Sequence, residues 1–147
     1  MDTTTSSQME ILDDGTCRAL LDTVDVGRLA VSIMNVPDIF PVNFIVELGD
    51  VVFRTAEGTK LAAAVLGKAV AFEVDGYDPL EGVAWSVVIH GHAVEIEKME
   101  AVYAALDLPL FPWHSSPKSR FVRIDTREIS GRRFLVDQSV DASRRRR

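Results

Sequence analysis

A succession of short apolar segments with few helical patterns between them is the feature of this chain that most limits its fold. Alternating or continuous apolar residues predict strands at residues 28–34, 41–48, 51–54, 69–75, 84–96 and 119–134. Helical patterns are confined to residues 14–23, a segment starting at about Thr59, and residues 97–106. A doubly wound parallel sheet is excluded because strands and helices do not alternate. We therefore expect a mainly β protein of the α+β class, an antiparallel sheet closed into a small barrel with short helices.

Turn-forming residues set the expected boundaries of these elements. Gly27 should end the first helix, and residues 35–40 should form a loop between the first two strands. Gly49 and Asp50 predict a tight hairpin turn before the third strand. Gly91 lies inside a long apolar segment, where glycine is typical of a bulge or a bend.

The chain of 147 residues suits a single domain, which we place at residues 11–137. Residues 1–10 are polar and residues 138–147 end in a basic run, so we expect both segments to be disordered. The net charge is −6 although the last four residues are arginines, and the acidic remainder is a poor surface for nucleic acid. No apolar run approaches the roughly 20 residues of a membrane span, and the first residues lack a secretory pattern. The expected location is the cytoplasm, without a nucleic-acid or membrane partner.

Residues that often carry chemistry are few and scattered. Cys17 is the single cysteine, so it has no internal disulfide partner, and we expect it to be a half-buried helix residue. His90 and His92 share one strand face, but no third ligand accompanies them, so no metal site is predicted. Trp113 and His114 lie in a proline-rich segment that could cover a site. No Ser-His-Asp or Cys-His arrangement supports hydrolysis.

Residues 51–60 combine an apolar strand with a polar turn that suits a phosphate. Arg54 and Thr55 end the strand, and Thr59 and Lys60 begin the expected helix. Free N–H groups and the positive end of the helix dipole would face the same anion as the two cations. The turn matches neither a Walker loop nor a dinucleotide-binding glycine motif. The alternative is ordinary: two solvated cations, with Thr59 as a helix N-cap.

Several segments in this order resemble the pyridoxamine 5′-phosphate oxidase-like family of flavin-binding split β-barrels. The similar segments are Val26-Gly27-Arg28-Leu29-Ala30, Pro41-Val42-Asn43-Phe44, residues 53–61, Ala71-Phe72-Glu73-Val74-Asp75, residues 82–93, Phe121-Val122-Arg123-Ile124 and Ile129-Ser130-Gly131-Arg132-Arg133. Together they span about residues 16–135. The resemblance implies an antiparallel split barrel that dimerises, with FMN in a groove at the subunit interface.

The resemblance also implies roles for individual residues. The flavin ring would lie beside Val42, Asn43 and Phe44, and the phosphate would lie at Arg54, Thr55, Thr59 and Lys60. The segment Trp85-Ser86-Val87 would contribute contacts near the polar edge of the ring. Because side chains alternate along a strand, Trp85 and Ser86 should face opposite sides. No metal is implied, and no catalytic side chain can be assigned.

The function implied by the resemblance is an FMN-dependent oxidoreductase of a small organic molecule. Vitamin B6 oxidation is not expected, because the chain lacks the C-terminal Trp and Arg segment of the parent oxidases. A first alternative is an F420-dependent reductase, in which Lys118, Arg120 and Arg123 would meet the acidic tail of the cofactor. A second is a flavin or haem carrier or sensor without turnover. A third is a structural dimer module with an empty groove.

Overall fold

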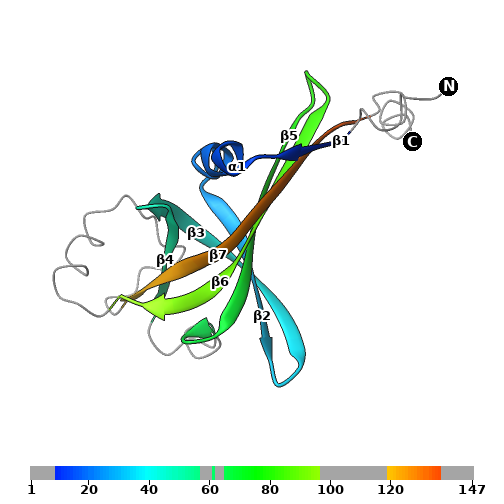
Figure 1. Cartoon of the computed structure of the whole chain (residues 1–147). Helices are drawn as coiled ribbons and strands as arrows, with labels where there is room; N and C mark the ends of the chain where they lie inside the picture. Colours follow the sequence, from blue (N-terminus) through cyan, green and yellow to red (C-terminus); the bar gives the residue numbers. More distant parts are fainter. Residues whose placement is uncertain (1–8, 57–60, 62–64, 97–118, 137–147) are drawn as a thin grey trace.

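The computed structural model describes residues 9–56, 61, 65–96 and 119–136. Its elements, in chain order, are β1 (Met9–Leu12), α1 (Asp14–Leu21), β2 (Val26–Ile33), β3 (Val36–Glu47), β4 (Asp50–Ala56), β5 (Ala69–Asp78), β6 (Val83–Glu95) and β7 (Ser119–Leu135). The strands form one antiparallel sheet in the order β1-β7-β4-β3-β2-β5-β6, and an additional β6–β7 pairing closes it (Figure 1). The predicted antiparallel barrel is confirmed. The expected helix at 97–106 and the proline-rich segment at 108–114 lie outside the described residues.

The barrel interior is filled by side chains that alternate along the strands with outward-facing ones. Phe53, Phe72 and Leu29 are fully buried there, and Phe44 meets Phe72 edge to face with ring centroids 5.0 Å apart. Val65 has helical backbone and is buried in the same core. The start of the helix expected at about Thr59 lies outside the described residues.

The first hairpin differs from the expected loop at residues 35–40. The strands β2 and β3 pair from Val26 opposite Asn43 to Ile33 opposite Val36, so the turn is only Met34 and Asn35, whose φ values are 49° and 66°. Two positive φ values are what a two-residue hairpin turn needs. Residues 36–40 belong to β3, and the prediction of a loop there is wrong because Pro37 does not break this strand.

Proline is tolerated in β3 because this half of the strand has a free edge. Phe44 N donates to Asp25 O, on the side of β2. Because N–H directions alternate along a strand, the even-numbered residues of this half of β3 direct their N–H groups towards β2, and the odd-numbered residues direct theirs away from it. Pro37 and Pro41 belong to the outward set and would have no partner for an N–H. Ile39, between them, gives its N–H to the Asp38 carboxylate at 2.9 Å. The free edge of β3 therefore offers few donors to another strand.

Helix α1 begins and ends where its caps dictate. Asp13 accepts from Thr16 N at 2.7 Å as the N-cap, and Asp22 is the C-cap, so Gly27 does not end the helix as expected. Gly27 lies inside β2, where a Cβ would be 2.6 Å from Phe72 Cε2. The glycine makes room for a core ring. Cys17 is fully buried rather than half-buried.

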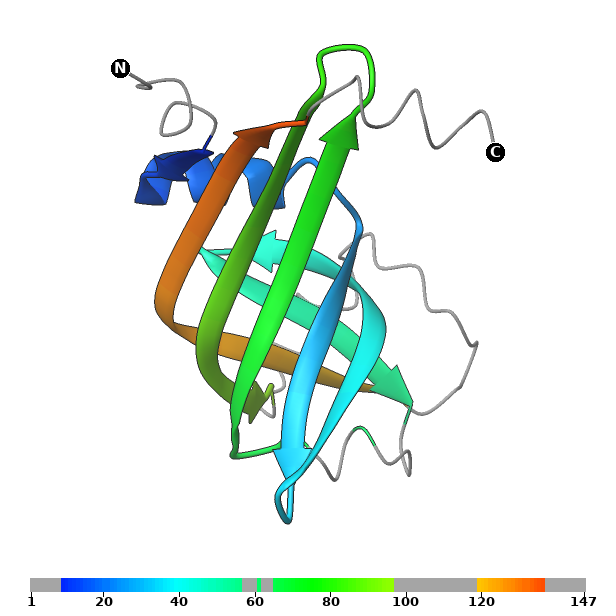
Figure 2. The ribbon, with the colours of Figure 1, turned by 90° about the vertical axis from the view of Figure 1, so that its right-hand side faces the viewer.

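Strands β5, β6 and β7 extend beyond the barrel as a long arm, to which β1 adds a further strand (Figures 1 and 2). The predicted irregularity at Gly91 is confirmed as a register shift between His90 and Gly91 opposite β7. A Cβ at Gly91 would overlap the carbonyl oxygen of Asp125. Met9 and Glu10, expected to be disordered, pair with β7, so the ordered chain begins before residue 11.

Candidate functional site

The strands β3 and β4 separate at one end of the barrel, and four of the expected site residues, Asn43, Phe44, Arg54 and Thr55, lie there. Phe44 opposite Phe53 is the last pair of this hairpin, and both side chains enter the core. By alternation, Asn43 and Arg54 point outward just past that pair, while Thr55 points inward. Beyond Phe53, β4 is paired with β7 alone in the described part of the chain. We call this opening the split.

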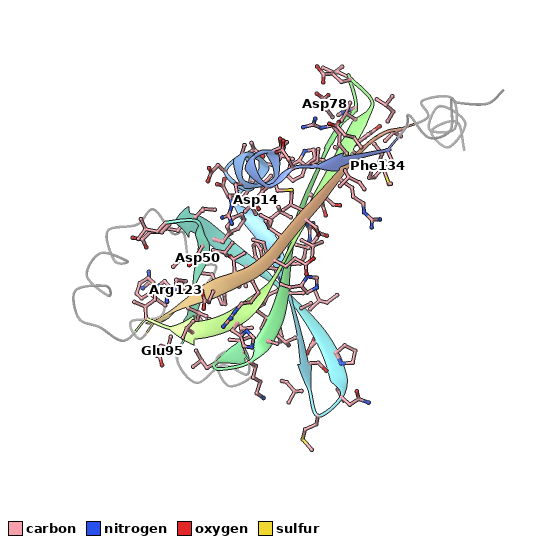
Figure 3. All side chains as sticks on the ribbon, viewed as in Figure 1. Asp14, Asp50, Asp78, Glu95, Arg123 and Phe134 are labelled. Carbon is pink, nitrogen blue, oxygen red and sulfur yellow. The ribbon has the colours of Figure 1, made fainter. Side chains whose placement is uncertain are left out.

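Arg54 carries a charge that no carboxylate neutralises within the described residues. Its guanidinium carbon lies 5.7 Å from the centre of the Phe121 ring, and its Nε is buried without a hydrogen-bond partner. The neighbouring Arg123 is different, because its Nε lies 3.8 Å from Asp50 Oδ2 (Figure 3). Among the described residues, Arg54 therefore has no carboxylate partner, and its Nε still has a donor to offer an anion.

Thr55 places a second unsatisfied polar atom at the split. The residue is only 4% exposed, and its Oγ1 has no hydrogen-bond partner among the described residues. A buried hydroxyl without a partner costs about 1–3 kcal/mol, so proteins rarely keep one without a reason. Arg54 and Thr55 point to opposite faces of β4, and a phosphate would meet both around the free edge of the strand. The residues present fit such a group; Thr59 and Lys60 lie outside the described residues.

The remaining expected site residues divide between the core and the outer face. Val42, Phe44 and Val87 are core residues, so a ligand could meet them only through their backbone. Trp85 packs partly against the core and over Gly76, where a Cβ would lie 2.6 Å from its ring. Ser86 points to the opposite face, as the alternation predicts.

Ser86 and Asn43 lie on the same outer face of the sheet. Asn43 pairs with Val26 in β2, and Ser86 pairs with Asp75 in β5. The strand order places three spacings between Asn43 and Ser86, which is about 14 Å. An extended molecule that starts at the split could therefore reach Ser86 across β2 and β5.

Three charged side chains that sequence reasoning missed lie between these two positions. Arg28 Nη1 lies 3.1 Å from Asp75 Oδ2 and 3.5 Å from Glu73 Oε1. The longer contact lacks hydrogen-bond geometry, so Glu73 Oε1 remains without a hydrogen bond. Desolvation, assisted by the hydrogen bond and charge of Asp75, raises the pKa of Glu73 to about 7 against the opposing effect of Arg28. The sequence pattern that could have predicted this cluster is the alternation of residues 71–75, which puts Glu73 and Asp75 on the same face of the strand.

Of the cations named for an F420 tail, Arg123 pairs with Asp50, and Arg120 lies in β7 opposite Thr55. His90 and His92 are exposed, and no group of three His, Cys, Asp or Glu in the described part of the chain could hold a metal. Lys118, Trp113 and His114 lie outside the described residues, as does the Arg120 side chain. Within the described ranges, no helix is long and apolar enough to cross a bilayer.

Comparisons with known proteins agree with the split-barrel fold. The structure of the FAD-binding protein from Mycobacterium smegmatis is 38% identical, with a TM-score of 0.79 over 87% of this chain and 100% of that one. An uncharacterised protein of Mycobacterium tuberculosis is 35% identical over 131 residues, or 86% of each sequence. An FAD-binding protein from Mesorhizobium loti, at 22% identity, shares the fold with a TM-score of 0.71 over 85% of this chain and 97% of that one. The pyridoxamine 5′-phosphate oxidase family matches residues 13–133, and the chain belongs to this family of split-barrel proteins.

Proposed function

We propose that this protein binds a flavin nucleotide with its phosphate at the split and uses it to reduce or oxidise a small organic molecule. The observation that carries the proposal is the pair of unsatisfied polar atoms, Arg54 Nε and Thr55 Oγ1, at the free end of β4. A phosphate supplies acceptors for both, and hydrogen bonds between charged groups are the strong ones. The FAD-binding relative from Mycobacterium smegmatis, at 38% identity, supports the flavin class.

In this proposal each described residue has a limited task. Arg54 and Thr55 hold the phosphate, with Thr59 and Lys60 as further contacts. Asn43 and Ser86 orient the rest of the molecule along the outer face. A bound flavin supplies the redox chemistry, taking hydride from a nicotinamide or a reduced deazaflavin, while the protein provides position and electrostatics.

FMN is the nucleotide that we propose, and FAD and F420 are the alternatives to test. F420 is less favoured because Arg123, one of the three cations named for its acidic tail, is already paired with Asp50. The mass of small molecules released from the purified protein would name the cofactor directly. Titrations with FMN, FAD, F420 and riboflavin, followed by fluorescence, would rank them. A colourless protein that takes up none of the four would end the proposal.

We further propose a homodimer that places the cofactor groove at the subunit interface. Apolar side chains form a row across the arm, with Met9 opposite Phe134, Phe134 opposite Ala84, and Ala84 opposite Tyr77, and all of them except the partly buried Ala84 are exposed. We call these four residues the arm row. An exposed apolar surface of this kind favours association with a partner. Ser86 lies on the same face as the arm row, two residues from Ala84, so a second copy bound there would contribute its own groups near Ser86.

A non-catalytic flavin carrier or sensor is the second candidate. The observation that favours it is that Asn43, Arg54, Thr55 and Ser86 can bind or orient a ligand but are poor proton donors near neutral pH. Rates of flavin reduction by NADPH and by reduced F420 separate the two functions. Rapid and saturable reduction, followed by reoxidation with a specific acceptor, would exclude the carrier. An Arg54→Ala, Lys60→Ala protein with unchanged FMN affinity would instead favour a structural dimer module.

A further inference from the structure

Phe121 is a buried aromatic residue that does not belong to the barrel core. It is 4% exposed, and its neighbour Val122 enters the core while Phe121 points to the outer face. The register of β4 and β7 places Phe121 directly opposite Arg54. Its ring therefore lies against the base of the split rather than in the packed interior.

The contact between Phe121 and Arg54 restrains the arginine and leaves its Nε without a hydrogen-bond partner. The guanidinium carbon is 5.7 Å from the ring centre, within the range of a cation–π contact. Such a contact uses the flat face of the guanidinium, whereas the N–H groups lie at its edge. With Nε buried and unpartnered, Arg54 is held in place without being neutralised.

We propose that Phe121 is a positioning residue that holds the Arg54 guanidinium in the orientation that binds the phosphate of the nucleotide. This inference rests on the proposed function, since it requires Arg54 to meet that phosphate. A free arginine side chain has many rotamers, and ordering it on binding has an entropic cost. The Phe121 ring removes part of that cost in advance, so it contributes to affinity without touching the ligand.

The test compares FMN with riboflavin, which lacks the phosphate. Phe121→Leu removes the ring and keeps an apolar side chain, Phe121→Tyr keeps the ring, and Phe40→Leu in β3 is the matched control. Phe40 lies opposite Leu29 and packs against the barrel core, so its replacement should leave both affinities unchanged. We expect Phe121→Leu to weaken FMN by roughly three- to tenfold, the range of a cation–π contact, with riboflavin unaffected. Phe121→Tyr should restore FMN binding.

A double variant supplies the second readout. In an Arg54→Gln protein, Phe121→Leu should cause no further loss of FMN affinity, because the residue it acts through is gone. Equal losses for FMN and riboflavin, or additive losses in the double variant, would show a general packing role and overturn the inference while leaving the flavin proposal intact. A wild-type protein that binds neither ligand would overturn both.

Discussion

Replacing Thr55 by valine should change the stability of the cofactor-free protein and its affinity for FMN in opposite directions. The side chain is almost fully buried, and its hydroxyl has no partner among the described residues. Valine has nearly the same shape but no polar atom. The substitution therefore removes a desolvated hydroxyl and leaves the neighbouring packing almost unchanged.

The expected magnitudes follow from the cost of an unsatisfied polar group. Such a hydroxyl costs about 1–3 kcal/mol, so Thr55→Val should raise the free energy of unfolding of the cofactor-free protein by about 1 kcal/mol. The same change removes a hydrogen bond to a charged phosphate, worth about 1.5–3 kcal/mol, so FMN should bind roughly 10- to 150-fold more weakly.

Urea denaturation of the cofactor-free protein gives the stability, and fluorescence titration gives the FMN affinity. Thr126→Val is the matched control, because Thr126 Oγ1 is also buried without a hydrogen bond but lies where β7 passes the bulge at Gly91, away from the split. It should raise stability in the same way and leave FMN affinity unchanged. Two results would refute the reasoning. One is a Thr55→Val protein that is clearly less stable than the wild type without cofactor, and the other is a Thr55→Val protein that binds FMN as tightly as the wild type does.

Three other predictions test the fold, the cluster of Arg28, Glu73 and Asp75, and the dimer. Gly27→Ala should destabilise the protein by about 1–3 kcal/mol, because the added Cβ would meet the Phe72 ring. Adding Phe72→Leu to the same chain should restore part of the lost stability, as measured by urea denaturation. If the two losses of stability simply added, the steric cause would be contradicted. The pKa of Glu73 is about 7 in the folded protein and has the ordinary value of 4.5 in the unfolded chain. Between these two pH values, the folded protein therefore binds the Glu73 proton more tightly than the unfolded chain does. As the pH rises from about 4.5 to 7, the unfolding free energy of the wild type should therefore fall relative to that of Glu73→Gln. Above about pH 7 the two curves of unfolding free energy against pH should run parallel. Curves that are parallel at every pH would exclude the raised pKa of Glu73. Tyr77→Ser with Phe134→Ser should convert the proposed dimer to a monomer in light scattering, and an unchanged mass would remove the arm row from the interface.

The hypothesis for the candidate site came from one short segment of sequence. Arg54 and Thr55 stand together at the end of an apolar strand, a pattern that suits a phosphate but also suits a solvated strand end. Phe121 was not predicted as a site residue, because a phenylalanine in an apolar strand is most often a core residue. Its role depends on being opposite Arg54 across two strands that are far apart in sequence.

The sequence by itself determined most of the strands and the antiparallel class, because alternation and turn residues act over a few neighbours. Only the tertiary structure decided that residues 36–40 continue a strand, that Gly27 makes room for Phe72, and that Glu73 lies between Asn43 and Ser86. These outcomes depend on strand register and on which edge stays free. Register is set by the burial of the whole apolar face at once, and no local segment contains that information.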